Sequence, residues 1–505
     1  MNGLAHTKRM CAWLARAPVG THEDSRNQIM KTHHYLIAII ALAGLPAVFP
    51  AHGAGPSRED ELANRHSDPL AQIGNVNVTQ LRLAWKIETE TPVTHQPLVQ
   101  DGRIYFADWS GGISAADAKT GKVLWQKAVE QPMTNWPWHG FCGTGTLGEG
   151  MLFEASAEGN AFAVDTQSGA VKWKTRFVGD EKNAGNCGTI FYQDDLVFIG
   201  VSSVEEGLAL QIKGFEVKFR GSVVALNATT GKEAWRLSLV APPANGVPVW
   251  SSFALDAATG TLFFTTGNNY TGKGTKFSDA IIAVDAKTGK VRWSRQFTEQ
   301  DVWTMAQASG PDYDFGSGPQ LFEGTNRKLV GAGQKSGVYH ALDRNTGEIV
   351  WQTTVGYGEI GGGIMADAAV KDGKVFVWSN NSYQPKSRKA DETPMTIKAV
   401  DAATGIPSWI LPKAQPAGVT SAGFVSEDVF FAGSLDGRVR AYSAKDGKTL
   451  WSSPEGQASV GSSLTVSGDT LYFGAGVPKV FGGNDQGGNG VFAYKVGATP
   501  PGKGL

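Results

Sequence analysis

Two carboxylates stand two residues apart in the segment GPDYDFGSGPQLF, at Asp312 and Asp314. If this segment is extended, alternate side chains face the same way, so one carboxylate can hold a cation while the other accepts a proton. The pair thus offers acid–base chemistry beside a cation.

Two further residues have side chains that can bind a ligand. Trp250 falls outside the regular spacing of the other tryptophans, and an exposed indole can stack on a planar, polycyclic molecule. Lys335, in AGQKSGVYHALD, supplies a cation that can stabilise a developing oxyanion. The structural alternatives are one more core tryptophan and a solvated turn lysine like Lys287.

A repeated segment must position these residues. AVDAKTGKVRW, residues 283–293, recurs in close copies along the chain, among them AADAKTGKVLW from Ala115 and ALDRNTGEIVW from Ala341. The alternating apolar residues predict a strand with one buried face. The following polar turn places glycine where the backbone must reach a positive φ, and the second strand ends in tryptophan. Each unit is therefore a hairpin whose tryptophan a neighbouring unit must bury.

The tryptophans count the units and predict the fold. They are Trp85, Trp125, Trp173, Trp235, Trp293, Trp351, Trp409 and Trp451. The intervals of 40 to 62 residues leave room for a second hairpin in each repeat. We therefore predict an all-β, eight-bladed β-propeller with four-stranded antiparallel blades. The alternative is a linear solenoid, but the first unit lacks the turn and the last strand, GVFAYKV, lacks its tryptophan, so the two ends can complete one another.

The N-terminus predicts export. Met30 and Lys31 precede the apolar run YLIAIIALAGLPAVF and the small residues AHGAG, which is typical of a secretory signal. We expect residues 1–53 to be an upstream extension plus signal peptide with its true start at Met30. Residues 54–497 would then form one propeller and residues 498–505 a flexible tail. The expected location is periplasmic or secreted, with no membrane span in the mature chain.

The net charge and the cysteine content indicate which partners and cofactors the chain can be expected to bind. Removing residues 1–53 takes away five basic and two acidic residues, which leaves 41 − 45, a net charge of −4. Nothing in this balance favours nucleic acid. Cys142 and Cys187 remain and form either a disulfide or two separate buried thiols. The chain contains no C-x-x-C-H motif for covalent haem.

The repeat A-x-D-x-x-T-G-x-x-x-W resembles that of the quinoprotein alcohol dehydrogenases, which hold pyrroloquinoline quinone (PQQ) and usually Ca²⁺ on the propeller axis. Outer-membrane assembly propellers without a cofactor carry a similar repeat. VWSSFALDAATGTLFFTTGNNY resembles the family segment in which a tryptophan forms the floor beneath the quinone and an asparagine eighteen residues later binds the metal. The resemblance assigns these roles to Trp250 and Asn268, and it places Lys335 beside the reactive carbonyl.

Further segments extend the resemblance. It implies Glu205 as a ligand of the metal at the cofactor, with Glu206 as the alternative, although a glutamate in a long loop can equally be solvated. Together with the Asn268 amide, such oxygen donors suit a hard cation such as Ca²⁺. VW followed after an insertion by GPDYDFG is similar to the polyvinyl alcohol dehydrogenase branch. It implies Asp312 as base and metal neighbour, with Asp314 as the alternative base. The D-x-D pair also resembles lanthanide-using members, though in a shifted context, so Ca²⁺ is the expected metal.

The chain also departs from the family pattern. The family usually roofs the quinone with a disulfide between adjacent cysteines, but Cys142 is followed by Gly143. The arginine that often pairs with a cofactor carboxylate has no counterpart in FCGTGTLGEG. A bridge from Cys142 to Cys187 would be a replacement for the roof.

The resemblance implies oxidation of primary or secondary alcohols, including polymeric alcohols, with hydride transfer to PQQ. Because the chain has no haem motif, a separate cytochrome c would accept the electrons. The alternative is a non-catalytic scaffold or binding propeller similar to the outer-membrane assembly propellers.

Overall fold

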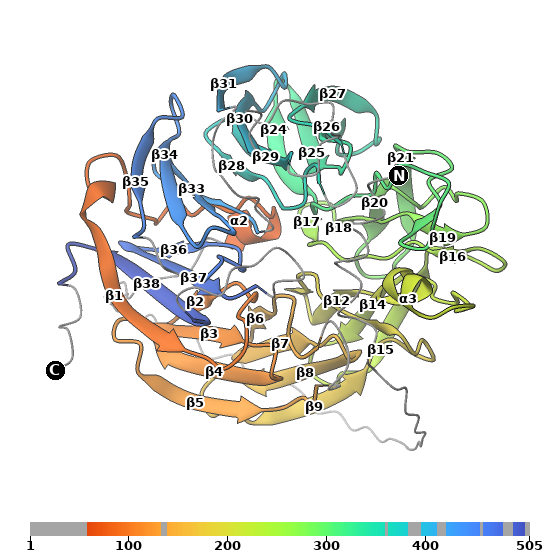
Figure 1. Ribbon diagram of the computed structural model, residues 1–505, viewed down its shortest axis with the longest axis horizontal. Coiled ribbons are helices and arrows are strands. Elements are labelled where there is room, and N and C mark those ends of the chain that lie inside the picture. Colours follow the sequence, from red (N-terminus) through yellow and green to blue (C-terminus); the bar gives the residue numbers. More distant parts are fainter. Residues whose placement is uncertain are drawn as a thin grey trace, which may run out of the picture.

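Eight four-stranded antiparallel sheets form a closed ring in the computed structural model (Figure 1). The structure describes residues 58–132, 139–358, 362–381, 395–411, 421–454, 458–477 and 488–499. The predicted eight-bladed propeller is confirmed, and the linear solenoid is wrong. The expected signal segment, residues 1–53, lies outside the described residues, as does most of the expected tail. Within the described residues, no helix is long and apolar enough to cross a membrane.

The first four blades follow the chain order, with the last strand of each blade at the rim of the ring (Figure 1). Their strands are β2 (Leu98–Gln100), β3 (Arg103–Ala107), β4 (Gly112–Asp117) and β5 (Val123–Ala128); β6 (Thr146–Gly148), β7 (Met151–Ala155), β8 (Asn160–Asp165) and β9 (Val171–Arg176); β11 (Phe191–Gln193), β12 (Leu196–Gly200), β14 (Ser222–Asn227) and β15 (Glu233–Ser238); β17 (Ala254–Asp256), β18 (Thr261–Thr265), β20 (Ala280–Asp285) and β21 (Val291–Gln296).

The next three blades and the closing blade complete the ring. Their strands are β24 (Gln320–Gly324), β25 (Arg327–Gly333), β26 (Val338–Asp343) and β27 (Ile349–Thr354); β28 (Ala369–Lys371), β29 (Lys374–Asn380), β30 (Met395–Asp401) and β31 (Pro407–Leu411); β32 (Phe424–Ser426), β33 (Val429–Gly433), β34 (Val439–Ser443) and β35 (Thr449–Ser452); β36 (Thr465–Ser467), β37 (Thr470–Ala475), β38 (Gly490–Val496) and β1 (Leu81–Glu88).

The repeated tryptophans join each blade to the next. The indole Nε1 of Trp235 donates to the carbonyl oxygen of Ala286 at 3.0 Å. Its ring lies so close to Gly289 that a Cβ there would come within 2.6 Å of it, and Gly289 also has a φ of 69°. The repeat glycine therefore serves both the turn and the neighbour's indole. The same packing recurs for Trp85 on Gly121, Trp125 on Gly169, Trp173 on Gly231, Trp293 on Gly347, Trp351 on Gly405 and Trp409 on Gly447.

The two ends of the described chain close the ring in one sheet. The N-terminal strand β1 pairs antiparallel with β38, from Leu81 opposite Val496 to Glu88 opposite Gly490. The strand without a turn thus completes the blade whose last strand lacks its tryptophan, as predicted. Because β1 is the outermost strand of this blade, closure covers the otherwise unpaired outer edge of β38.

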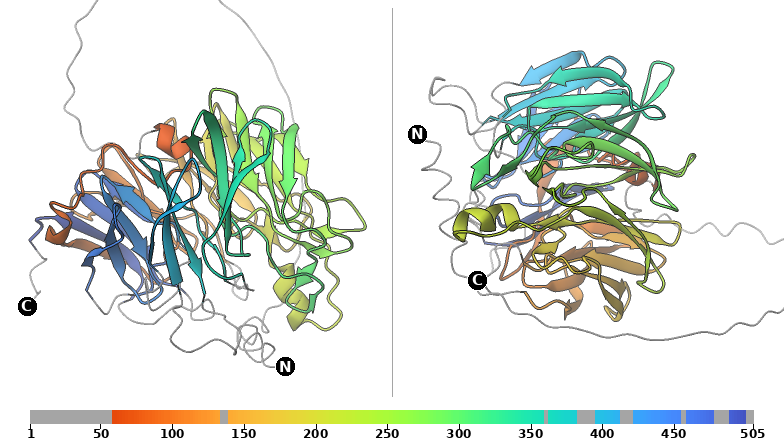
Figure 2. Two further views of the ribbon diagram at one scale, coloured as in Figure 1. Left: turned by 90° about the horizontal axis from the view of Figure 1, so that it is seen from above. Right: turned by 90° about the vertical axis from the view of Figure 1, so that its right-hand side faces the viewer.

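Insertions between the repeated strands gather on one face of the ring. They comprise the helix α3 (Glu205–Gln211) and three two-stranded ribbons, β10 (Ala184–Gly185) with β13 (Ser202–Ser203), β16 (Asn245–Gly246) with β19 (Asn269–Thr271), and β22 (Trp303–Thr304) with β23 (Gln307–Ala308). The N-terminal helix α2 (Arg58–Leu62) lies at the opposite face from α3 (Figure 2), and the 3-10 helix η1 (Val78–Gln80) leads into β1. One face of the ring therefore carries the inserted helix and ribbons, and the other carries the N-terminal helix.

Candidate active site

A cavity of about 470 Å³ opens at the axis of the ring on the side of α3. Trp250, Asp314 and Lys335 line it, and Glu206 and Tyr270 contribute further polar groups. These residues come from different blades or from the insertions between them. We call this space the α3-side cavity.

Lys335 lies between two carboxylates. Its Nζ is 3.1 Å from Oδ1 of Asp312 and 2.8 Å from Oδ1 of Asp314. The backbone N–H of Lys335 also donates to the carbonyl oxygen of Asp314 at 2.9 Å. Burial disfavours the lysine charge, but Asp312, Asp314 and Glu206 outweigh burial and raise the pKa of Lys335 above its usual range. Lys335 is therefore a buried cation rather than a solvated turn lysine.

The two aspartates of the D-x-D pair differ in access. Asp314 lines the α3-side cavity, whereas Asp312 is 1% exposed and lies behind Lys335. Asp312 has a φ of 62°, so the segment is not extended as we expected; both carboxylates nevertheless meet on Lys335. Burial raises the pKa of Asp312 well above its usual range, Lys335 opposes the rise, and Asp314 and Glu206 add to it.

Asp301 fixes the backbone of that pair. Its carboxylate accepts the backbone N–H groups of Asp312 and Tyr313 at 3.2 and 2.6 Å. Burial raises the pKa of Asp301, and these two hydrogen bonds oppose the rise. Asp301 directly precedes the VW of the sequence, which is the one signal that points to it.

Trp250 is not a core residue of the ladder. Its ring is partly exposed on the α3-side cavity, and its Nε1 donates to Oδ2 of Asp314 at 3.1 Å. Lys335 Nζ lies 5.7 Å from the ring centroid, within the range of a cation–π interaction. The indole, the carboxylate and the ammonium thus form one connected group.

The two glutamates at the start of α3 point to different surroundings. Both Glu205 oxygens are engaged: Oε1 accepts from Asn183 at 2.9 Å, and Oε2 accepts the backbone N–H groups of Lys218 and Phe219. Glu206, in contrast, lines the α3-side cavity. Burial raises the pKa of Glu206 to about 7, Lys335 opposes the rise and Asp314 adds to it. Glu205 therefore holds the loop after α3, and Glu206 faces the site.

Asn268 lies beneath the cavity rather than on its lining. It is 1% exposed, and its Nδ2 donates to the carbonyl oxygens of Asn269 and Trp303 at 2.7 and 2.8 Å. Among the described residues, no group of three histidine, cysteine, aspartate or glutamate side chains is arranged to hold a metal ion. The acids instead gather around the Lys335 ammonium.

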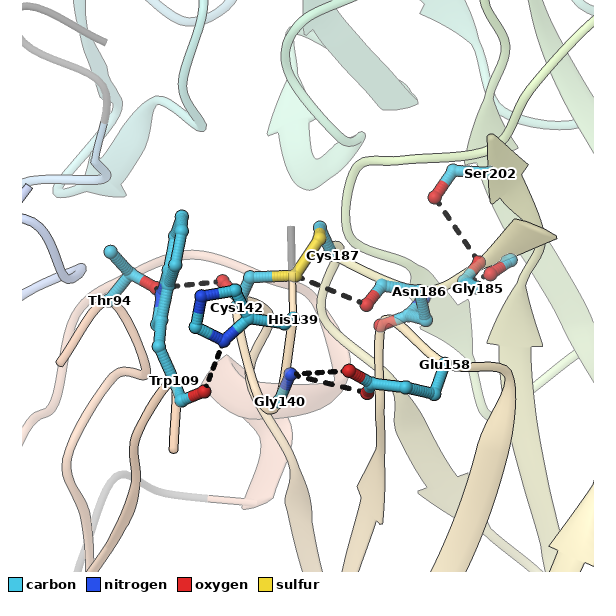
Figure 3. Close-up of a disulfide and its surroundings, with 11 residues drawn as sticks. Thr94, Trp109, His139, Gly140, Cys142, Glu158, Gly185, Asn186, Cys187 and Ser202 are labelled. Atoms are coloured by element: carbon cyan, nitrogen blue, oxygen red, sulfur yellow. Dashed lines mark hydrogen bonds between the residues drawn. A yellow bond between two sulfur atoms is a disulfide. The ribbon is translucent and has the colours of Figure 1, made fainter. Parts of the chain in front are cut away.

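Cys142 and Cys187 form a disulfide, which settles the two alternatives left by the sequence (Figure 3). The Cα atoms are 4.9 Å apart, within the usual range. Both cysteines line the α3-side cavity, where the bridge ties the loop before β6 to the loop before β11. Trp109 supports it by donating from Nε1 to Thr94 Oγ1 at 2.8 Å, and that hydroxyl donates to the Cys142 carbonyl oxygen. The disulfide is thus one side of the same cavity that holds Trp250.

Tyr270 and Asp279 are buried groups near the site that the sequence analysis missed. Tyr270 lines the cavity, and burial together with Glu206 and Asp314 raises its pKa well above the usual range. Asp279 is fully buried, and neither carboxylate oxygen has a hydrogen-bond partner within the described chain. Burial and the nearby Asp301 raise the pKa of Asp279. Tyr270 follows Asn268 by two residues, so the segment was identified although this side chain was not.

Comparisons with known proteins agree with this geometry. The family pattern described as glucose/ethanol/alcohol dehydrogenase, beta-propeller domain, matches residues 57–142 and 242–355. The pattern of the outer membrane protein assembly factor BamB matches residues 334–504. The first match includes Trp250, Asp312 and Asp314, and Lys335 lies in both. The first of these matches places the chain beside the quinoprotein-type propellers.

Named relatives make the assignment more specific. The chain is 29% identical over 463 residues to the polyvinylalcohol dehydrogenase of Sphingopyxis sp. (strain 113P3), covering 83% of this chain and 69% of that protein. It is 29% identical over 427 residues to the polyvinylalcohol dehydrogenase of a Pseudomonas species, covering 77% and 66%. The chain thus spans about two thirds of the length of these relatives. These matches make the PQQ-dependent alcohol dehydrogenases the family that the chain resembles.

A solved structure shows the shared fold. A europium-containing methanol dehydrogenase superposes with a TM-score of 0.71 at 19% identity, over 88% of this chain and 98% of that one. At this identity the likeness extends to the propeller and not to the chemistry of its centre.

Proposed function

We propose that this protein oxidises primary or secondary alcohols, including polymeric alcohols, with PQQ as hydride acceptor. The observation that carries the proposal is the connected group of Trp250, Asp314 and Lys335 on one cavity at the ring axis. The two polyvinylalcohol dehydrogenases among the relatives support the substrate class.

The cavity suits a flat, anionic quinone. The Trp250 indole offers an aromatic face, and the Lys335 ammonium lies beside it. The disulfide of Cys142 and Cys187 borders the same space and supports the role of a replacement roof. Bound there, PQQ would supply the two-electron redox chemistry that side chains lack.

A hard cation would draw on the acids around Lys335. Glu206, Asp312 and Asp314 offer carboxylate oxygens, and the buried Asn268, two residues before the lining residue Tyr270, has an amide oxygen. We propose Ca²⁺, with a lanthanide as the second candidate, because the oxygen donors suit both classes of hard ion. Since the ammonium now lies between Asp312 and Asp314, cation binding requires Lys335 to move. Glu206 takes the place that we expected for Glu205.

The catalytic residues divide the work as follows. The Asp314 carboxylate reaches the cavity and would accept the alcohol proton, whereas Asp312, buried behind Lys335, would hold the cation. The Trp250 N–H fixes Asp314 Oδ2, so the lone pair that takes the proton keeps its direction. Lys335, displaced from between the two aspartates but still at the cavity, would balance the negative charge that develops as the alcohol is oxidised. Asp314 therefore replaces Asp312 as the proposed base.

We propose the same cellular setting as the sequence implies. The enzyme would work in the periplasm or after secretion and would pass electrons to a separate cytochrome c. An intrachain disulfide fits an oxidising compartment.

A scaffold without catalysis is the second candidate. It is favoured by the match of residues 334–504 to the outer membrane protein assembly factor BamB. That match covers the blades after the Trp250 and Asp314 segments, so it leaves out most of the proposed site.

Reconstitution tests the proposal directly. The purified chain from residue 54 is incubated with PQQ and Ca²⁺, and dye reduction is followed with secondary alcohols and polyvinyl alcohol. We expect turnover by the wild type, and a loss of about 10³-fold in kcat for Asp314→Asn. The control is Asp256→Asn. Asp256 is buried and paired with Arg344 at 3.3 Å, but it does not line the α3-side cavity. Absence of both PQQ binding and turnover in the wild type would favour the scaffold.

A further inference from the structure

One carboxylate at the edge of the α3-side cavity collects donors from three separate parts of the chain. Asp367 is 9% exposed and lies in the segment between β27 and β28. Its Oδ1 accepts the backbone N–H of Gly318 at 2.6 Å. Its Oδ2 accepts from the Ser252 hydroxyl, from Asn64 Nδ2 at 2.9 Å and from His66 Nε2 at 3.2 Å. Asp367 is therefore the hub of a buried network.

The hub joins the two loops that carry the proposed chemistry. Ser252 follows Trp250 by two residues, and Gly318 follows Asp314 by four. The loops touch directly, since a Cβ on Gly318 would collide with the Ser252 hydroxyl. Asp367 and Ser252 line the same cavity as Trp250. A single carboxylate thus bridges the backbone beside the indole and the backbone beside the acid.

The remaining donors come from an N-terminal strap, residues 58–66, that crosses the opposite face of the ring. Its backbone carbonyls accept the N–H groups of Leu321, Val370 and Val425, which belong to the inner strands β24, β28 and β32. The strap is therefore anchored to three blades before its side chains reach the hub.

Two residues of the strap adopt a backbone conformation that side chains disfavour. Asn64 and His66 have φ values of 52° and 48°. Residues persist there only when surrounding contacts determine their position, so the strain suggests a function. Here it turns both side chains toward Asp367, and Asn64 Nδ2 also lies 2.8 Å from Ser252 Oγ.

The network favours the ionised form of Asp367. Burial opposes ionisation of Asp367, but the hydrogen bonds from His66, Ser252 and Asn64 outweigh burial and hold its pKa below the usual range. A carboxylate that accepts four donors fixes their relative positions more strongly than a neutral group would.

We propose that Asp367 is a positioning residue that sets the Trp250 indole relative to Asp314 and Lys335, and that Asn64 and His66 hold it in place. Its effect on catalysis rests on the proposed function, whereas its effect on the indole does not. Loss of the hub should therefore misplace the platform even in the protein without cofactor.

The decisive experiment observes the indole itself. The chain is labelled with 5-fluorotryptophan, and Trp250→Phe identifies the Trp250 signal in the ¹⁹F NMR spectrum. Asp367→Asn should shift or broaden that signal and leave the ladder signals in place. Asp256→Asn is the matched control, because it also removes a buried charge but should leave Trp250 unchanged.

A second pair of variants covers the case in which Asp367→Asn fails to fold. His66→Ala removes one donor of the hub, and His66→Gln restores a donor. We expect the Trp250 signal to move in the first variant and to return toward the wild type in the second. An unmoved Trp250 signal in both His66→Ala and folded Asp367→Asn overturns the proposal.

PQQ binding distinguishes the positioning role of Asp367 from the proposed function. PQQ affinity is measured by quenching of tryptophan fluorescence, without turnover. We expect Asp367→Asn to bind PQQ about tenfold more weakly and Asp256→Asn to bind like the wild type; equal affinity in both counts against the proposal. A wild type that binds no PQQ would sink the proposed function, yet the NMR result would still decide whether Asp367 positions the indole.

Discussion

Two cavities in the described part of the ring differ in size, and the larger one is not the one that Trp250, Asp314 and Lys335 line. The cavity on the side of α2 has a volume of about 760 Å³, and its lining includes residues of the inner strands β2, β6 and β11. Its lining includes ion-paired groups, such as Arg58 with Glu61 at 2.9 Å. The smaller α3-side cavity holds the buried Lys335 with its carboxylates.

The difference follows from which parts of the sequence build each cavity. Repeated strands supply one face, and their residues serve packing and turns. The insertions that bear Glu206, Trp250 and Asp314 supply the other face, and there burial and neighbouring charges shift pKa values. Thr144, Thr189 and Ser252 line both cavities, so the two environments meet at a shared boundary. Perturbed charge, and not volume, therefore distinguishes the proposed active site from the larger cavity.

The largest expected effect contrasts one acid from each cavity. Asp314→Asn should lower kcat by about 10³-fold, because it removes the proposed base. Asp194→Asn makes the same chemical change on the α2 side, at an exposed residue that already has a φ of 47°. We expect its kcat to stay within about twofold of the wild type, since exposed substitutions have small effects. Dye reduction under saturating alcohol measures both, and equal losses would contradict the contrast.

The next effect concerns the disulfide that borders only the α3-side cavity. Replacing both Cys142 and Cys187 with serine releases a loop of 45 residues. Loop-closure entropy predicts a loss of about 4 kcal/mol in the free energy of unfolding. Urea unfolding measures this loss, and wild type treated with a reductant should match the variant. Unchanged stability in both samples would show that the bridge does not constrain the unfolded chain.

The repeat shows how far sequence reasoning reaches. The propeller, its closure and the shared location of Trp250, Asp314 and Lys335 could be predicted, because repeat spacing and motif context are local in the chain. The choice between Glu205 and Glu206 could not, since it depends on which way the first turn of α3 faces. The hub was invisible for another reason: His66 and Asp367 are 301 residues apart.

A smaller effect tests whether the ladder is purely architectural. Gly289→Ala would place a methyl group 2.6 Å from the Trp235 ring at a φ of 69°. We expect a loss of about 2 kcal/mol in unfolding free energy, from overpacking and backbone strain. Gly260→Ala is the control. Gly260 also has a positive φ, of 62°, but a Cβ there would meet open space, so we expect only the backbone cost of about 1 kcal/mol. Both variants should bind PQQ like the wild type, and weaker binding would tie the ladder to the site.

The smallest effect lies at the boundary between the cavities and depends on pH. The folded state holds the pKa of Asp367 below its usual range, whereas in the unfolded chain it returns to about 3.9. Between these values the unfolded state binds the extra proton, so the contribution of Asp367 to stability is full above about pH 4 and is lost as pH falls through the folded pKa.

Asp367→Asn removes that titration. The unfolding free energy of the variant should therefore fall less steeply below pH 4 than that of the wild type. The two slopes should differ by at most the amount that corresponds to one bound proton. Urea midpoints from pH 2.5 to 6 measure the slope, with Asp194→Asn as a control that keeps the wild-type curve. Parallel curves for Asp367→Asn and the wild type would mean that the Asp367 charge gains no stability from its four donors. Asp367 would then not couple the two cavities through its charge.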